Sequence, residues 1–390
     1  MKILYLCGDH GIAAFGRKGA STHMREMIAA FRGLGHEICL AASDLSGDRR
    51  DEEDFQTVKL PTSSSRLLGH DGRYVWANRQ ARAPLEEAVR TFRPDAIYER
   101  SALYFGAGAW LAKKHGLPRI MEVNALLAEE QRTRLHFAGA ARKFEENLLR
   151  KATAIAAISN QMCGQLKELG CDPARLRPFP MAVDPSRFHP SPRPNAHRKS
   201  LNWPADAVVL GYVGSMNSYH RPSWYVDFAE KILRRAERDV RFLIVGGTPD
   251  KIQRYRSRLL KWEEEGRVLF TGSVPQAEMV GWLSAMDAVL IPGASPQSTP
   301  TKIFETAAVG RPMLLPATEP ISEICGADSI FLFKANDFRS FEDKVRDYLA
   351  RPRIYDAAAE EFRNFVVEKH TWEQHARRLV EWFQRMKDEG

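Results

Sequence analysis

Residues 287–316, DAVLIPGASPQSTPTKIFETAAVGRPMLLP, hold the pattern on which the prediction of the fold depends. An apolar strand opens this stretch, a helical segment that we expect to stop at Gly310 follows a loop, and a second apolar strand comes after it. We expect Thr299 to cap the helix and Pro300 to take its first position. Strand, helix and strand in this order form the unit from which parallel sheets are built.

The same alternation runs through both halves of the chain. The expected strands are 2–7, 37–43, 95–100, 118–123 and 152–159 in the first half, and 207–215, 240–247, 267–273, 287–293, 312–317 and 329–333 in the second. Helical patterns lie between them, for example at 22–34 and 223–236. We therefore predict an α/β protein with two Rossmann-like, doubly wound domains that face a cleft. Ligands of such sheets bind beyond the carboxyl ends of the strands.

A segment rich in proline and polar residues, HPSPRPNAHRKSLNWP (189–204), separates the two halves. We predict a first domain over 1–190, a linker over 191–204 and a second domain over 205–370. The remaining segment, 371–390, is predicted as an amphipathic helix that returns to the first domain.

The composition is that of a globular protein, with 44% hydrophobic and 27% charged residues among 390, which excludes a disordered or fibrous chain. No apolar run approaches the roughly 18 residues that cross a bilayer, and the apolar start is too short for a signal peptide. We expect the mature protein to begin at Met1 and to stay in the cytoplasm. The five cysteines are scattered without a CxxC, and no HxxH or HExxH occurs, so neither a disulfide framework nor a metal site is expected.

The net charge is +8, from 57 Lys and Arg against 49 Asp and Glu. A basic surplus suits an anionic ligand, an anionic membrane surface or nucleic acid. No RNP, zinc-finger or helix-turn-helix pattern is present, so no nucleic-acid partner is expected. Residues 135–151 are basic and partly apolar; a solvated helix is the favoured interpretation, with peripheral contact at the inner membrane face as the alternative.

Lys302 and Glu305 lie near the start of the helix that follows strand 287–293. Free backbone N–H groups at a helix start attract phosphate, and Lys302 adds a full positive charge. A carboxylate one turn further on, at Glu305, can accept hydrogen bonds from two ribose hydroxyls while the helix end holds a diphosphate. The alternative is a well-capped surface helix without a ligand.

The capped helix, its K-x-x-E, its alanines and the following G-x-P resemble the donor-site segment of GT-B fold glycosyltransferases of the retaining GT4 type. Further segments resemble the family in the same order: GDHGIAAFGRKGASTHMREM (8–27), RKATAIAAISNQMCGQLKELGCD (150–172) with RPFPMAVDPSRFHP (177–190), VLGYVGSMNSYHRP (209–222) and HTWEQHARRL (370–379). The resemblance implies transfer of a sugar from a nucleotide-diphosphate donor, such as a UDP- or GDP-sugar, to a hydroxyl of a glycan, glycolipid or natural product. It implies retention of configuration, with no metal or cofactor.

The resemblance also implies which residues bind the donor. Glu305 matches the glutamate that binds the ribose, and Gln297 stands where the family has a glutamate that contacts the transferred sugar. The other implied donor-binding residues are Lys18, Gly19, Gly214, Ser215, His220, Arg221, Val274, Ser298, Thr299, Thr301 and Lys302. Ser215 and His220 replace an arginine and a lysine of the family, which leaves Arg221 and Lys302 to neutralise the diphosphate. For Gly19 the alternative is a turn needed only for chain geometry.

Many relatives carry a histidine at the end of the strand where this chain has Glu122-Val123-Asn124. Side chains two apart on a strand share one face, so we expect Asn124 to orient the donor sugar or the acceptor hydroxyl. Glu122 is expected to be either the partner of Asn124 or the base that takes the acceptor proton. The alternative for Glu122 is a simple ion pair with Arg100. Arg100 and Glu129 are acceptor-side candidates, although a glutamate such as Glu129 is more often a solvated helix charge.

Three other functions compete with this prediction. A dinucleotide oxidoreductase would need G-x-G-x-x-G after the first strand, and the chain lacks it. A sugar-nucleotide epimerase or phosphorylase of the same fold would share the nucleotide site, and a non-catalytic relative would bind the nucleotide without turnover. The sequence leaves open the base and sugar of the donor, the acceptor and the oligomeric state.

Overall fold

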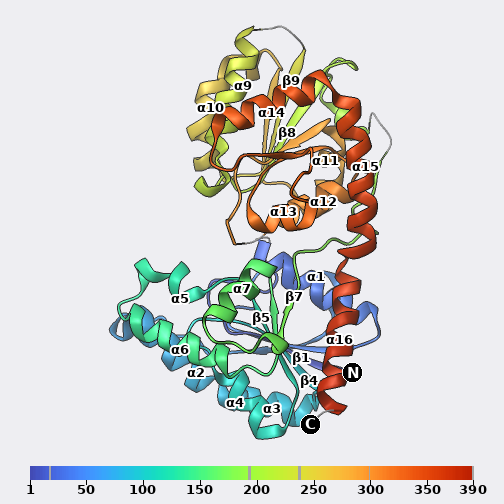
Figure 1. Ribbon diagram of the computed structural model, residues 1–390. Coiled ribbons are helices and arrows are strands. Elements are labelled where there is room, and N and C mark those ends of the chain that lie inside the picture. Colours follow the sequence, from blue (N-terminus) through green and yellow to red (C-terminus); the bar gives the residue numbers. More distant parts are fainter. Residues whose placement is uncertain (17–18, 192–194, 236–238, 298, 389–390) are drawn as a thin grey trace. The chain divides into compact units, whose positions relative to one another are not determined.

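The computed structural model describes residues 1–16, 19–191, 195–235, 239–297 and 299–388. The chain forms two compact units, each built around its own sheet (Figure 1). Unit 1 comprises Met1–Pro180 and Trp372–Gly390, and unit 2 comprises Met181–Thr371. The prediction of two parallel α/β domains is confirmed.

Unit 1 holds a parallel sheet of seven strands in the order β3-β2-β1-β4-β5-β6-β7. These strands are β1 (Lys2–Cys7), β2 (Glu37–Ala42), β3 (Gln56–Lys59), β4 (Ala96–Arg100), β5 (Arg119–Val123), β6 (Ile155–Ala157) and β7 (Leu176–Pro178). The helices are α1 (Gly19–Gly33), α2 (Gly69–Gln80), α3 (Arg82–Phe92), α4 (Ala107–His115), α5 (Leu127–Glu130), α6 (Ala138–Arg150), α7 (Asn160–Glu168) and α16 (Trp372–Asp388). The strand order reverses between β1 and β4, and a sheet of this kind binds ligands beyond the carboxyl ends of its strands at such a point.

Unit 2 holds a parallel sheet of six strands in the order β10-β9-β8-β11-β12-β13. These are β8 (Val208–Val213), β9 (Val240–Val245), β10 (Val268–Gly272), β11 (Ala288–Leu290), β12 (Met313–Pro316) and β13 (Leu332–Phe333). The helices are α8 (Ala196–Ser200), α9 (Pro222–Arg235), α10 (Pro249–Glu264), α11 (Met279–Ala285), α12 (Thr301–Ala308), α13 (Glu319–Cys325), α14 (Phe338–Ala350) and α15 (Pro352–Lys369). The order reverses between β8 and β11, so their carboxyl ends mark the expected ligand site of this unit.

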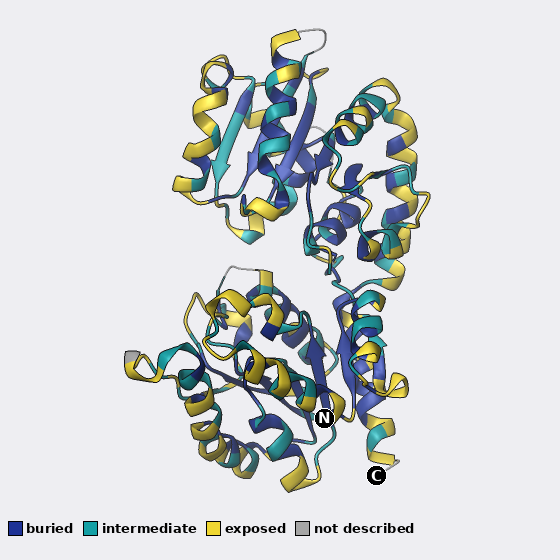
Figure 2. Ribbon diagram, turned by 60° about the vertical axis from the view of Figure 1, so that its left-hand side comes forward, coloured by how far each residue is buried: buried dark blue, intermediate teal, exposed yellow. Residues whose placement is uncertain are grey.

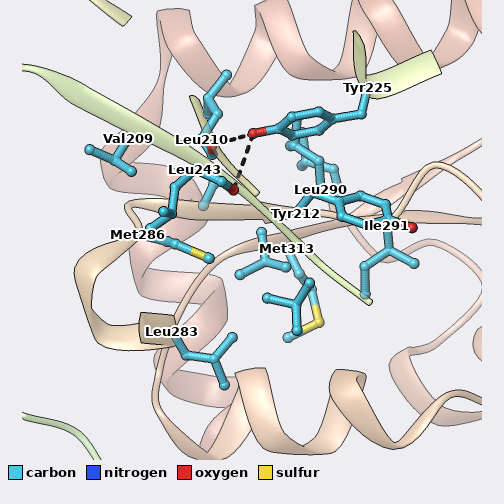
Figure 3. Close-up of a cluster of buried hydrophobic side chains, with 14 of the residues drawn as sticks. Val209, Leu210, Tyr212, Tyr225, Leu243, Leu283, Met286, Leu290, Ile291 and Met313 are labelled. Carbon is cyan, nitrogen blue, oxygen red and sulfur yellow. Dashed lines mark hydrogen bonds between the residues drawn. The ribbon is translucent and has the colours of Figure 1, made fainter. Parts of the chain in front are cut away.

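The inner strands of both sheets are buried, whereas the outward sides of the helices are exposed (Figure 2). Burial on both faces explains why the strands are nearly continuous apolar runs. The core of unit 2 also contains Tyr225, whose hydroxyl donates to the Leu210 carbonyl at 2.6 Å, so the buried polar atom is satisfied (Figure 3). All five cysteines are free thiols. Among the described helices, none combines the length and the apolar character needed to cross a membrane.

The helix α16 belongs to unit 1, as predicted, and packs against α1. Its first residue, Trp372, meets the ring of His23 edge to face at 4.8 Å. Further along, Trp382 stacks on Phe179 and the Arg378 guanidinium donates to the Pro178 carbonyl. The apolar face predicted from the sequence therefore packs within unit 1.

The predicted domain boundary is wrong by about ten residues, because unit 2 begins at Met181. The described part of the predicted linker, 191–204, also folds onto unit 2. The Asn195 amide donates to the Gly281 carbonyl at 2.7 Å, and Arg198 pairs with Asp287 at 3.1 Å. Proline and polar residues predicted a solvated connection, but these side chains bind α11 and Asp287, the residue before β11.

Candidate functional site

Lys302 is the central residue of the candidate site in unit 2. It is the second residue of α12, its side chain is only 9% exposed, and its Nζ donates to the Val213 carbonyl at the end of β8 at 2.9 Å. Burial lowers the pKa of Lys302 to about 8, although the neighbouring Glu305 acts to raise it. Burying an amine whose hydrogen bond goes to a neutral carbonyl is costly for the fold, and such groups concentrate at functional sites.

Two glycines shape the backbone around this amine. Gly214 follows β8 with φ 157°, and a Cβ there would lie 3.0 Å from the Lys302 Nζ. A Cβ on Gly293, which follows β11, would lie 2.4 Å from the Tyr219 carbonyl oxygen. Side chains at these positions would push the loops after β8 and β11 away from each other and from Lys302. The adjacent Ser215 is exposed.

His220 is buried beside the same amine. Its Nδ1 lies 3.3 Å from the Gly293 carbonyl, which can only accept, so Nδ1 carries the proton. Burial and the charge of Lys302 lower the pKa of His220 to about 4. The imidazole is therefore neutral at pH 7 and supplies no permanent positive charge.

Arg221 provides the second cation of the site. Its backbone is left-handed at φ 49°, and its guanidinium lies 4.5 Å from the Trp224 ring centre. One Nη donates to the Asn336 amide oxygen at 2.5 Å. Stacking and the hydrogen bond hold the guanidinium in one orientation, which favours recognition of a phosphate or carboxylate.

The expected cap of α12 is not formed. The helix begins at Thr301 with Pro300 in the capping position, and no described side chain caps it. Thr299 is buried, and its hydroxyl instead donates to the Pro320 carbonyl at 2.9 Å. The helix ends as predicted, with Gly310 at φ 71° just past its last turn.

The remaining donor-side candidates of unit 2 lie on α12, in the loop before it, and between β10 and α11. Glu305 is half-buried one turn after Lys302. The backbone N–H of Gln297 donates to the Ser295 hydroxyl at 3.2 Å in the loop before α12. Val274 packs against the core between β10 and α11. Ser298 lies outside the described residues.

In unit 1, Lys18 also lies outside the described residues, and Gly19 begins α1. A Cβ at Gly19 would meet no described atom within 4 Å, so the space beside this glycine is open. Steric crowding within the fold therefore does not explain why glycine stands there.

Glu122 lies at the centre of a buried polar cluster in unit 1. Its neighbours are the Tyr98 hydroxyl at 2.8 Å, Arg100 Nη1 at 2.5 Å, His23 Nε2 at 3.2 Å and the Asn124 amide, which donates to it. Arg100 and Glu122 face each other because β4 and β5 pair in that register.

Burial acts to raise the pKa of Glu122, but His23 and Arg100, together with the hydrogen bonds from His23 and Asn124, outweigh it and hold this pKa well below its ordinary range. A carboxylate so strongly stabilised is a poor proton acceptor. The contacts fit two of the three interpretations of Glu122, as the partner of Asn124 and as the ion pair of Arg100. They do not favour the third, the base.

Sequence reasoning missed His23 and Tyr98 as members of this cluster. Tyr98 is two residues before Arg100 on β4, so strand alternation placed both side chains on one face. The alternation is the signal that identifies Tyr98. By contrast, Glu129 lies on α5 as an exposed charge, 3.9 Å from Arg132. Within the described ranges, no three His, Cys, Asp or Glu side chains gather in a way that could hold a metal.

Comparison with known proteins places this geometry in a class. The structure of an Anabaena protein, HepE, solved in complex with UDP and glucose, superimposes with a TM-score of 0.74 at 15% identity, covering 98% of this chain and 99% of that one. This similarity shows that the chain has the GT-B glycosyltransferase fold, which is built from two parallel α/β units.

Two family models match the chain directly. Residues 18–182 match the glycosyl transferase 4-like domain, and residues 207–351 match the glycosyl transferases group 1 domain. The chain therefore belongs to the glycosyl transferase family that these two models describe.

Two curated relatives illustrate the range of this similarity. D-inositol 3-phosphate glycosyltransferase 2 of Catenulispora acidiphila is 28% identical over 230 residues, which is 54% of this chain and 52% of that protein. A GDP-mannose-dependent alpha-(1-6)-phosphatidylinositol dimannoside mannosyltransferase of Mycobacterium tuberculosis is 26% identical over 80% of this chain and 79% of its own length. The match to the first of these spans only about half of that relative.

Proposed function

We propose that the chain transfers a sugar from a nucleoside-diphosphate sugar to an acceptor hydroxyl with retention of the anomeric configuration. The observation that carries this proposal is the buried Lys302 amine beside Gly214, at the carboxyl ends of the strands where the order of the sheet reverses. In the reaction, the bond from the anomeric carbon to the phosphate oxygen breaks, and a bond to the acceptor oxygen forms on the same face. The acceptor proton passes to the leaving diphosphate.

The charges of unit 2 suit a leaving diphosphate. Lys302, Arg221 and the uncapped N–H groups at the start of α12 are electropositive groups available to an anion. A diphosphate next to Lys302 stabilises the ammonium form and so offsets part of the cost of burying the amine. With these cations in place, we propose that transfer needs no metal ion.

Glu305 is assigned to the ribose. It is half-buried one turn beyond Lys302 on the same helix, so its carboxylate can accept hydrogen bonds from sugar hydroxyls. Thr301 and the backbone of the preceding loop, with Gln297, are assigned to the phosphates and the transferred sugar. The Anabaena structure contains UDP and the mycobacterial relative is named for GDP-mannose, so both bases are candidates for this chain.

The unit 1 cluster is assigned a positioning role. Same-face attack assisted by the leaving phosphate requires no protein base, which agrees with the low basicity of Glu122. Because Glu122 fixes the Asn124 amide, Asn124 is the candidate group that orients a sugar or acceptor hydroxyl. We further propose that the protein acts in the cytoplasm, where nucleotide sugars are the usual donors.

The first experiment is thermal stabilisation by UDP, GDP, ADP, CDP and dTDP, each with and without EDTA. A diphosphate at about 100 times its dissociation constant adds roughly 2.7 kcal/mol to the stability of the folded state. We expect one of the five to stabilise the protein strongly whether or not EDTA is present. Silence from all five in a folded sample would overturn the proposal, and a response abolished by EDTA would overturn metal independence.

The Glu305→Ala variant tests the ribose assignment. We expect at least a tenfold loss of affinity for the active diphosphate, because two hydrogen bonds to a charged group are lost. The matched control is Glu319→Ala, at the exposed first residue of α13, which should bind normally. Equal affinity in folded Glu305→Ala would show that the ribose binds elsewhere.

A further inference from the structure

Unit 1 exposes five large apolar side chains on two neighbouring segments. They are Leu67 (99% exposed), Leu68 (39%), Val75 (51%), Trp76 (38%) and Phe137 (68%), and we call them the α2–Phe137 surface. The other large apolar side chains exposed among the described residues all belong to unit 2. Single exposed apolar residues are ordinary, but a concentration of them marks an interaction site.

The helix geometry gathers three of these residues on one side. Leu68 precedes α2, and Val75 and Trp76 follow it by seven and eight positions, so they lie on the same face of the helix. Leu67 is adjacent, in the 3₁₀ turn η2 (Arg66–Leu68) that leads into α2. Ala77, on the opposite face of α2, is buried, and Asp71, which borders the exposed face, is buried too.

Hydrogen bonds attach the fifth residue to the start of α2. The Asp71 carboxylate accepts from the backbone N–H of His136 at 2.8 Å and from the Tyr104 hydroxyl at 2.9 Å. The same hydroxyl lies 3.4 Å from the Phe137 carbonyl. The backbone at Phe137 is thus held beside the first turn of α2, while the Phe137 side chain stays exposed.

That small core also joins α2 to α6. Tyr74 of α2 and Phe144 of α6 both pack on the buried cluster of Leu103, Tyr104, Ala128 and Ala141. The two helices are labelled in the same part of unit 1 in Figure 1. The exposed apolar side chains therefore stand on a packed base, which keeps them together on one surface.

The two segments that carry this surface have a surplus of positive charge. Residues 131–144 contain four Arg and Lys and no Asp or Glu, and residues 72–85 contain three Arg and no Asp or Glu. Arg132 lies 3.9 Å from Glu129 and Arg142 pairs with Glu146, so part of this charge is balanced from outside the segments. Arg134 and Lys143 are exposed and add to the surplus.

We propose that the α2–Phe137 surface docks on an anionic phospholipid bilayer. Leu67 and Phe137 enter the boundary between headgroups and acyl chains, and the surrounding cations meet the lipid phosphates. Exposed apolar side chains on segments with a surplus of cations fit such a surface better than a protein partner, whose interface cores are depleted of lysine and need a complementary shape.

The position of the surface also bears on the acceptor. The Tyr74 ring of α2 stacks on His10 at 4.4 Å, and His10 lies just past the carboxyl end of β1. A bilayer against α2 is thus close to the ligand end of the unit 1 sheet. Resting on the function proposed above, this favours an acceptor anchored in the membrane by a lipid.

The test is co-sedimentation of the purified full chain with vesicles. One set contains phosphatidylglycerol in phosphatidylcholine, and the other contains phosphatidylcholine alone. We expect binding at least tenfold stronger to the anionic vesicles, weakened by added salt. The double variant Leu67→Ser with Phe137→Ser should lose at least tenfold, and Arg134→Glu with Lys143→Glu should also bind more weakly.

The matched control is Leu260→Ser with Ile354→Ser on unit 2, where both side chains are 48% exposed. Equal loss in the control, no loss in the Leu67 and Phe137 variant, or no binding to either vesicle would overturn the proposal. A concentration-dependent dimer that the Leu67 and Phe137 variant abolishes would overturn it too, by assigning the surface to a second copy. Diphosphate stabilisation is measured without vesicles, so failure of the donor site and failure of docking are separate results.

Discussion

At the scale of single residues, Lys302 shows how a site works against the stability of its fold. Its ordinary pKa of 10.5 falls to about 8 on burial. Below pH 8 the amine is protonated in both states, and burying its charge lowers the free energy of unfolding by the full penalty. Between pH 8 and 10.5 the folded chain releases the proton that the unfolded chain still holds, so this penalty shrinks as the pH rises. At neutral pH the buried amine therefore lowers the stability of the folded protein unless an anionic ligand binds beside it.

The Lys302→Met variant tests that balance. Methionine fills similar space without a charge, so we expect the free energy of unfolding near pH 7 to rise by on the order of 1–2 kcal/mol. Diphosphate binding and transfer should fall at least a hundredfold. Unfolding curves and a diphosphate titration measure both effects, with Lys334→Met, an exposed lysine, as the control. A destabilised variant that still binds would contradict both expectations.

His220 gives a dependence on pH with a defined sign. Its pKa falls from 6.5 to about 4 in the folded protein, so between these values only the unfolded chain binds the proton. Stability should therefore decrease as the pH falls from about 6.5 toward 4. In His220→Asn, whose amide can still donate to Gly293, this contribution disappears. We expect the melting temperature of the wild type to fall more than that of the variant between pH 7.5 and 5; parallel decreases would show that His220 does not titrate there.

Residue roles were harder to predict than residue positions. The pairing of Arg100 with Glu122 follows from strand register, and both were singled out from the sequence. The low basicity of Glu122 depends on His23, which reaches it from a helix and has no local signal in the sequence. Thr299 is of a residue type that commonly caps helices, but its hydroxyl donates to the carbonyl of Pro320, which is distant in sequence.

At the scale of elements, hydrophobic runs located nearly all of the sheet. Every strand expected from an apolar run is present, usually shorter by one or two residues at its ends. The two missed strands, β3 and β7, are only four and three residues long, and their residues are largely half-exposed or polar. Such edge strands are set by pairing with a neighbour, which local sequence does not encode.

The C-terminal helix α16 is the element whose packing can be tested most simply. Leu379 is fully buried on it, so Leu379→Ala should lower the free energy of unfolding by about 2–5 kcal/mol through lost contacts and a cavity. The neighbouring exposed Glu381→Ala should change it by less than about 0.5 kcal/mol. Urea unfolding of both variants gives the comparison. A loss below about 1 kcal/mol for Leu379→Ala would mean that α16 contributes little to unit 1.

At the scale of the whole molecule, composition and alternation were sufficient for the class of fold and for the number of units. The boundary between the units was not, because the proline-rich segment 189–204 resembles a linker while Asn195 and Arg198 bind it to unit 2. The specific partners of these side chains decide the boundary, and they lie more than 80 residues away in sequence.

The division of the chain has a consequence for synthesis. Unit 2 is one continuous segment, whereas α16 completes unit 1 only after all of unit 2 has been made. At roughly 5–20 residues per second, the ribosome takes on the order of 10–40 s to pass from Pro180 to Trp372. For that time the face of α1 that α16 covers is exposed on the nascent chain. Unit 2, which is continuous in sequence, has all of its residues before unit 1 does.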